Sequence, residues 1–241
     1  MATNLAGGIC IGQHSTCLLR AAQLNPDCSV VGGADSGIVT YGIITATFTP
    51  EYTDERRIEP LNGCGTKLFG FRQPGKPTGG TITGEIGFHD WELMEILFGG
   101  SLIIGKAGGD FAGDVIGHAM PAEDDPTPPA VYLEVIVANA GEGVGECADA
   151  DSPFPAYTGH IFGKAKLTRD AATYNDAELT LAFTGTVEPN PNLVFGPWGD
   201  WPGTGVVPNS PWIEASYSQA EWEEIAADAA CGYGTLPAAY S

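Results

Sequence analysis

Alternation of apolar and polar residues with a period of two dominates the chain and predicts β-strands. The pattern is clearest in residues 37–49, 80–88 and 178–187. The apolar positions are Ile44, Ala46 and Phe48 in the first segment, Ile82, Ile86 and Phe88 in the second, and Leu179, Leu181, Phe183 and Val187 in the third. The opposite faces carry Thr45, Thr47 and Thr49, then Thr81, Thr83 and Glu85, then Thr180, Thr184 and Thr186. Strands that bury one face and expose the other are typical of antiparallel sheets.

Shorter apolar runs predict four further strands, at residues 16–20, 66–71, 131–137 and 160–168. About seven strands joined by Gly-rich turns favour a mainly β protein, built as an antiparallel sandwich or barrel. Three long segments, 50–65, 106–129 and 139–155, are predicted to be loops.

Capping residues predict two short helices. They are residues 91–98, capped by Asp90 and ended by Gly99-Gly100, and residues 222–229, preceded by the capping box Ser218-Gln219-Ala220-Glu221 and closed by Gly232. We expect one β domain over residues 1–187 with a flanking helix. Residues 188–241 are expected to form a C-terminal arm with a short helix, packed on the same domain or on a neighbour.

Charge narrows the function classes. The 241 residues carry a formal net charge of -20, and all ten basic residues lie between Arg20 and Arg169. A nucleic-acid binder needs a basic surface, and attraction to anionic membranes needs one too, so both are disfavoured. We also find no apolar run long enough for a membrane helix and expect no signal peptide. The six cysteines contain no CxxC pair, and we interpret them as packed thiols rather than bridges or zinc ligands.

Candidate chemistry is sparse, and each motif has an ordinary structural reading. Asp35-Ser36-Gly37 precedes a strand as a catalytic Asp can, but it is also good turn chemistry. His118 with the acids at 123–125 is a conceivable metal cluster, and a solvated loop is the alternative. Cys64, in Asn62-Gly63-Cys64-Gly65, could be a reactive thiol, but no basic residue adjoins it to lower its pKa, and a tight turn with a packed Cys is the alternative. Trp198 and Trp201 suit either stacking on sugars or anchoring an arm. No cofactor is expected.

The order of several motifs resembles the major tail tube proteins of long-tailed, non-contractile phages, most closely those of phages that infect actinobacteria. The matching pieces are Cys17-Leu18-Leu19-Arg20, Asp35-Ser36-Gly37, Phe48-Thr49-Pro50-Glu51-Tyr52, Asn62-Gly63-Cys64-Gly65, Thr83-Gly84-Glu85-Ile86, Asp90-Trp91-Glu92-Leu93, residues 179–185, Asn190-Pro191-Asn192 and Gly199-Asp200-Trp201-Pro202. The resemblance spans most of residues 10–202.

This resemblance implies a structural virion protein without enzymatic activity. Homohexameric rings would stack helically into a hollow tail tube, assembled in the host cytoplasm, through which DNA passes without specific binding. Tape measure, distal tail and tail terminator proteins would be its partners, and no membrane would be involved. The hairpin of residues 37–49 and 66–71 would help line the tube.

Three groups of residues follow from the resemblance. The predicted inter-ring contact loop contains Glu51, Asp54, Glu55, Arg56 and Arg57; the predicted lumen residues are Glu85, Thr81 and Thr83, in a net negative bore; and the predicted subunit-contact arm contains Trp198 and Trp201. Three alternatives stay open. They are another virion β protein (distal tail or capsid decoration protein), a carbohydrate-binding sandwich that uses Trp198, Trp201 and Trp212, and a hydrolase.

Overall fold

Antiparallel pairing organises almost the whole chain. The computed structural model describes residues 12–60, 69–87, 90–122, 130–140, 156–170, 180–193, 209–229 and 234–236. Nine strands form one sheet in the order β13-β2-β1-β9-β10-β11-β6-β3, with β12 paired to β10. These strands are β1 (Gly12–Gln23), β2 (Gly33–Thr40), β3 (Ile43–Tyr52), β6 (Pro77–Ile86), β9 (Val131–Ala140), β10 (Tyr157–Arg169), β11 (Leu181–Val187), β12 (Ile213–Tyr217) and β13 (Gly234–Leu236). The predicted mainly β, antiparallel fold is therefore confirmed.

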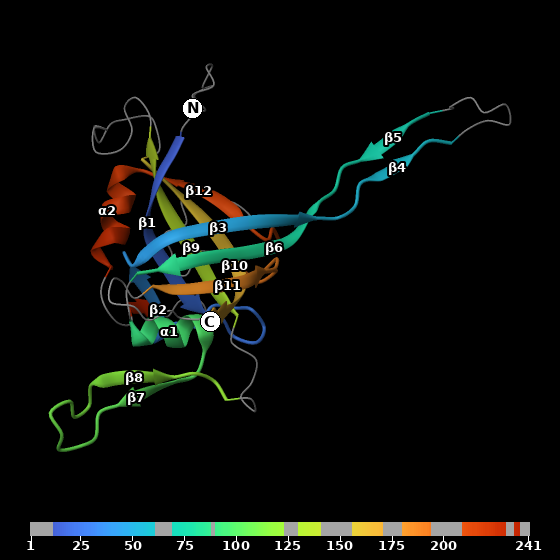
Figure 1. Cartoon of the computed structure of the whole chain (residues 1–241). Helices are drawn as coiled ribbons and strands as arrows, with labels where there is room; N and C mark the ends of the chain where they lie inside the picture. Colours follow the sequence, from blue (N-terminus) through green and yellow to red (C-terminus); the bar gives the residue numbers. More distant parts are fainter. Residues whose placement is uncertain are drawn as a thin grey trace.

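The long strand β10 folds this sheet into two layers. Its first half pairs with β9 and β12, and after a register shift between Phe162 and Ala165 its second half pairs with β11. In Figure 1, β3, β6 and β11 lie across β1 and β9. Buried side chains from both layers meet in one apolar core, whose members include Leu19, Leu133 and Phe183.

The two helices pack on different parts of this sandwich. Helix α1 (Trp91–Phe98) begins at Asp90, whose carboxylate accepts from the backbone N–H groups of Glu92 and Leu93, and it ends at Gly99. Five of its residues are buried in the interlayer core: Leu93, Met94, Ile96, Leu97 and Phe98. Helix α2 (Gln219–Ala227) has the predicted capping box but ends at Asp228, before Gly232. Its Ile225 joins a second apolar cluster on the outer side of the β1–β9 layer.

The predicted single strand over residues 37–49 is wrong. The chain leaves one layer at Thr40 and enters the other at Ile43, so the segment is divided between β2 and β3. A register shift between Ile43 and Thr45 also changes the expected burial at Ile44, while Ala46 and Phe48 pack against the core and Thr45, Thr47 and Thr49 are exposed as predicted. Ile43 is buried, whereas Ile44 is 45% exposed.

The expected hairpin partner and two expected loops also need correction. Strand β3 pairs with β6 rather than with residues 66–71, and the chain between them forms a second ladder of β4 (Arg56–Ile58) and β5 (Phe71–Gln73). Residues 50–52 and 56–58 of the predicted 50–65 loop are therefore strand, and residues 61–65 lie outside the described residues. Another hairpin, β7 (Ser101–Ile104) with β8 (Val115–Ala119), extends into the predicted loop at 106–129.

Candidate assembly surfaces

A projection distinct from the predicted C-terminal arm extends far from the sandwich (Figure 1). Its described residues are 51–60 and 69–76, and we call them the arm. It begins where β3 and β6 leave the core, and it continues as the β4–β5 ladder. Four large apolar side chains on its described part are exposed: Tyr52 by 57%, Ile58 by 36%, Phe69 by 61% and Phe71 by 52%. A two-stranded ladder is marginally stable in water by itself, and exposed apolar groups of this kind mark interaction surfaces.

All five predicted inter-ring residues lie on the arm. Glu51 is the second-to-last residue of β3, Asp54 and Glu55 precede β4, and Arg56 and Arg57 belong to β4; all five are exposed. Two ion pairs lie along this part of the arm: Arg57 Nη2 lies 2.7 Å from Glu59 Oε1, and Arg72 Nε lies 2.6 Å from Glu55 Oε1. Ion pairs between side chains this exposed contribute little to the stability of the ladder.

The β7–β8 hairpin is a second projection, directed away from the arm (Figure 1). His118 Nε2 lies 2.7 Å from the carbonyl oxygen of Gly99, which ties the base of the hairpin to the end of α1. Its exposed large apolar side chains are Ile103, Ile104, Phe111, Ile116 and Met120. These exposed apolar groups on a two-stranded ladder also mark an interaction surface. The sequence pattern did not predict this surface.

A hydroxyl-rich face covers the outer side of β3, β6, β11 and the second half of β10. We call it the threonine face. Cross-strand pairing places its side chains in three rows: Thr49, Thr81, Thr186 and Lys166; Thr47, Thr83, Thr184 and Thr168; and Thr45, Glu85 and Ala182. Each of these side chains is exposed or half-buried. The three predicted lumen residues, Thr81, Thr83 and Glu85, thus lie together at its centre.

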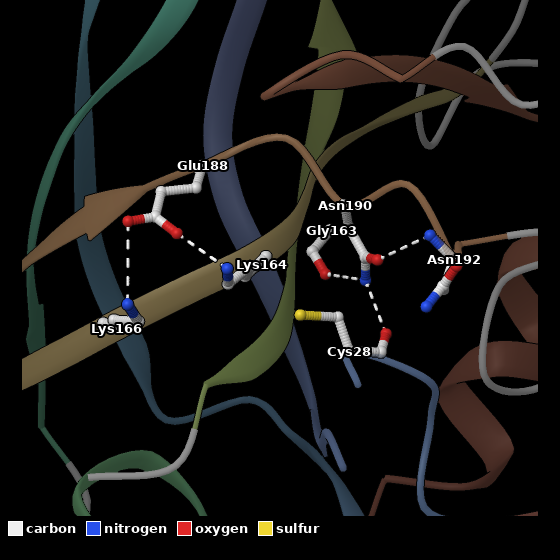
Figure 2. A network of polar contacts seen from close by, with 7 residues as sticks. All are labelled: Cys28, Gly163, Lys164, Lys166, Glu188, Asn190 and Asn192. Carbon is white, nitrogen blue, oxygen red and sulfur yellow. Dashed lines mark hydrogen bonds and ion pairs between the residues drawn. The ribbon is translucent and has the colours of Figure 1, made fainter. Parts of the chain in front are cut away.

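One carboxylate is shared by two lysines beside the threonine face. Glu188 lies between them, 2.7 Å from Lys164 Nζ and 3.6 Å from Lys166 Nζ (Figure 2). The hydrogen bond with Lys164 lowers the pKa of Glu188 and raises that of Lys164. Two carboxylates without an ion pair among the described residues complete the charges here: Glu85, and Asp170, which accepts from the Thr184 hydroxyl at 2.8 Å. These two lysines and three carboxylates carry a formal charge of -1 together, so the face is close to neutral.

Asn190 explains the Asn-Pro-Asn motif by its hydrogen bonds. Its buried Nδ2 donates to the carbonyl oxygens of Cys28 at 2.9 Å and Gly163 at 2.8 Å, and its Oδ1 accepts from the backbone N–H of Asn192 (Figure 2). Gly163 lies where β10 passes between the layers. One amide side chain therefore joins the turn after β1, the bend of β10 and the segment after β11, which is a structural role.

A buried ion pair, absent from the sequence predictions, crosses the β1–β9 ladder. Arg20 and Glu134 are direct cross-strand partners, with Nη1 3.3 Å from Oε2 and relative exposures of 2% and 1%. The hydroxyl of Tyr217 donates to Glu134 Oε1 at 2.5 Å, and that of Tyr132 donates to Oε2 at 3.3 Å. Gly159 leaves room for this cluster, because a Cβ there would lie 2.5 Å from Glu134 Oε1.

The residues considered for chemistry do not converge. Asp35 has a φ of 63° and is exposed within β2, while Ser36 donates to the carbonyl oxygen of Gly33. Among the described residues, no group of His, Cys, Asp or Glu side chains could hold a metal ion. Cys17 and Cys28 form no disulfide. Neither described helix has the length and apolar character needed to cross a bilayer.

Trp212 packs against other aromatic rings of the sandwich. Its ring centroid lies 5.1 Å from that of Phe48 and 6.3 Å from that of Tyr52. A cavity of about 280 Å³ beside these rings is also lined by His160 and Glu214. Trp198, Trp201, Cys64 and the acids at 123–125 lie outside the described residues.

Comparison with known proteins gives a distant likeness in structure. No protein-family model matches the chain, and no curated protein sequence matches it. Among solved structures, the chain is similar to one in the "Cryo-EM Structure of an Extracellular Contractile Injection System, PVC sheath-tube complex in extended state". The match covers 85% of this chain and 92% of that chain, with 9% identity and a TM-score of 0.34. These values are too low for the role of any residue to be transferred.

Proposed function

We propose that this protein is a structural subunit of a phage tail tube, assembled in the host cytoplasm and carried in the virion tail. The arm is the observation that supports this most strongly. It exposes apolar side chains along a ladder that has no described part of its own chain to pack on. A subunit that extends such an element gains stability only when another molecule covers it, which favours a role in assembly over one in catalysis.

Ring closure is supported by the free edge of β3. This strand ends the strand order, and its one described neighbour is β6. Exposed edges invite pairing with other chains, and a heterologous contact that closes by rotation gives a ring. We infer that β3 of each subunit meets the next subunit in a homohexameric ring. The arm then reaches an adjacent ring, which makes the stacking open-ended and helical.

The threonine face suits the wall of the bore. Protein cations bind phosphates and release the counterions of DNA; here the cation of the face, Lys166, is paired with Glu188, while Glu85 and Asp170 are carboxylates. Hydroxyl groups offer only neutral hydrogen bonds, which water replaces readily. A ring of Glu85 side chains gives the wall a weakly negative charge. DNA can therefore pass through during ejection without adhering.

From the resemblance of the sequence motifs we infer that this tube belongs to a long-tailed, non-contractile phage, with tape measure, distal tail and tail terminator proteins as partners. A different virion β protein, such as a distal tail or capsid decoration protein, is the competing assignment. Both would expose assembly surfaces, but only a tube subunit polymerises by itself into a hollow filament.

Electron microscopy of the purified protein tests the proposal. Negative-stain images over a range of concentrations should show tubes of stacked rings with a central channel. Light scattering should then report masses that rise with concentration. A protein that stays monomeric at high concentration, or that binds capsids as trimers, would contradict the proposal.

A further inference from the structure

The charge of the chain is divided unequally between residues 51–76, which contain the arm, and the remaining sequence. Residues 51–76 hold five of the ten basic residues against four acids, a net charge of +1. The remaining sequence holds five bases against twenty-six acids, a net charge of -21. Two cations of the arm, Arg56 and Lys76, are exposed and have no ion pair within the described residues. The arm is therefore the part of this subunit that another copy attracts.

Helix α2 presents an acidic surface on which the described residues place no basic side chain in an ion pair. Glu221, Glu223, Glu224 and Asp228 are all exposed, and the helix has no basic residue in its last turn. The C-terminal end of a helix carries partial negative charge, so acids there are unfavourable and a cation is favoured. No described residue of the same chain supplies that cation by an ion pair.

The exposed stripe of α2 also has room for the apolar side chains of the arm. Ala220, Glu223, Glu224 and Ala227 follow one another at helical spacing and are exposed. Small side chains at both ends of this stripe leave space for rings such as those of Phe69 and Phe71. Acids at the centre provide the partners for neighbouring cations.

The two surfaces lie on opposite sides of one subunit. Figure 1 shows α2 against one side of the sandwich and the arm leaving from the other side. An arm cannot reach the α2 of its own chain in this arrangement. A contact between them is therefore heterologous, and each copy offers one arm and one α2. When such a contact does not close into a ring, each copy uses its arm once and its α2 once, and the assembly can grow without limit.

We propose that the arm of one subunit docks on α2 of a second copy, with Arg56 and Lys76 facing Glu223, Glu224 and Asp228. This inference rests on the proposed tube and names the surface that receives the arm. Opposite charges would steer the encounter and fix its register. Because the Debye length is about 8 Å at physiological ionic strength, added salt should weaken stacking.

Charge reversal on each surface gives the test. One variant carries Glu223→Lys and Glu224→Lys, and a second carries Arg56→Glu and Lys76→Glu. Each alone sets like charges against each other, so the critical concentration for tubes, measured by sedimentation and microscopy, should rise at least about tenfold, a factor equivalent to about 1.4 kcal/mol. A control with Asp27→Lys and Glu92→Lys, which changes the charge equally on the turn after β1 and on α1, outside the proposed contact surfaces, should stay near wild type.

Mixing the two variants provides the decisive measurement. Each offers the surface that the other needs, so an equimolar mixture should form tubes at near wild-type concentration. That rescue also shows that both variants fold. The inference is overturned if the mixture remains unassembled, or if either variant alone polymerises like wild type. Wild-type protein that forms no tube at all would instead refute the proposed function, and with it this inference.

Discussion

The hydroxyl of Tyr217 offers the sharpest test of how the C-terminal segment is held. It donates to Glu134 Oε1 at 2.5 Å, inside a cluster whose members are at most 2% exposed. Tyr217→Phe removes this donor and keeps the ring. A hydrogen bond to a buried charge contributes about 1.5–3 kcal/mol. Since the carboxylate keeps Arg20 and Tyr132, we expect the free energy of unfolding to fall by about 2 kcal/mol.

Urea denaturation followed by tryptophan fluorescence measures this change without adding salt. Tyr41→Phe is the matched control, because the Tyr41 hydroxyl donates to Ala226 at 3.3 Å from an exposed position and should matter by less than about 0.5 kcal/mol. Arg20→Met should cost more, about 3–5 kcal/mol, because it leaves a buried carboxylate without its counterion. Equal losses for the two tyrosine variants, at unchanged denaturant slope, would refute this account of Glu134.

Four other changes test separate parts of the structure. Asn190→Ala leaves two buried carbonyl groups without their donor and should lower the free energy of unfolding by about 2–4 kcal/mol in urea melts. Ser218→Ala removes the capping box of α2 and should cost about 1 kcal/mol; no loss by circular dichroism melting would contradict the cap. Burial, partly opposed by Glu214, lowers the pKa of His160, so the unfolded chain binds the proton more readily. Stability should fall as the pH drops below about 6.5, and His160→Asn should flatten that dependence in unfolding measured across pH. Thr83→Lys adds a cation to the proposed bore; tubes should still form and should retain DNA in a salt-sensitive way, and unchanged retention would argue against that face as the bore.

Alternation predicted the strands whose two faces meet different surroundings. Leu181, Phe183 and Val187 are buried as expected, because β11 has the core on one side and water on the other. The same rule failed at Ile44, because a register shift between Ile43 and Thr45 leaves this residue outside the pairing and no residue pattern indicates it. The β7–β8 hairpin was hidden by its Gly-rich sequence, where turn residues outnumber strand formers.

The candidate surfaces depended on pairing that a single sequence does not state. Each threonine-rich segment was visible as a polar strand face, but their union into one face follows from the order β3-β6-β11-β10. Arg20 and Glu134 likewise lie over a hundred positions apart, and only the β1–β9 register brings them together. Asn190 belonged to a noted motif, yet its role depends on two distant carbonyl groups. The local residue pattern therefore predicted the strands and helices. Long-range strand pairing determined which side chains come together on the candidate surfaces.

The pairing of β13 with β2 means that one edge of the sheet stays uncovered until the end of synthesis. Gly234 pairs with Gly37, so the outer edge of β2 is covered by a strand about 200 residues further along the chain. At about 5–20 residues per second, a ribosome needs roughly 10–40 s to make the covering strand after β2 emerges. During this interval the nascent chain carries an open sheet edge. Neighbouring nascent chains on one messenger are then the nearest molecules able to pair with that edge, so spacing between ribosomes protects the subunit until β13 arrives.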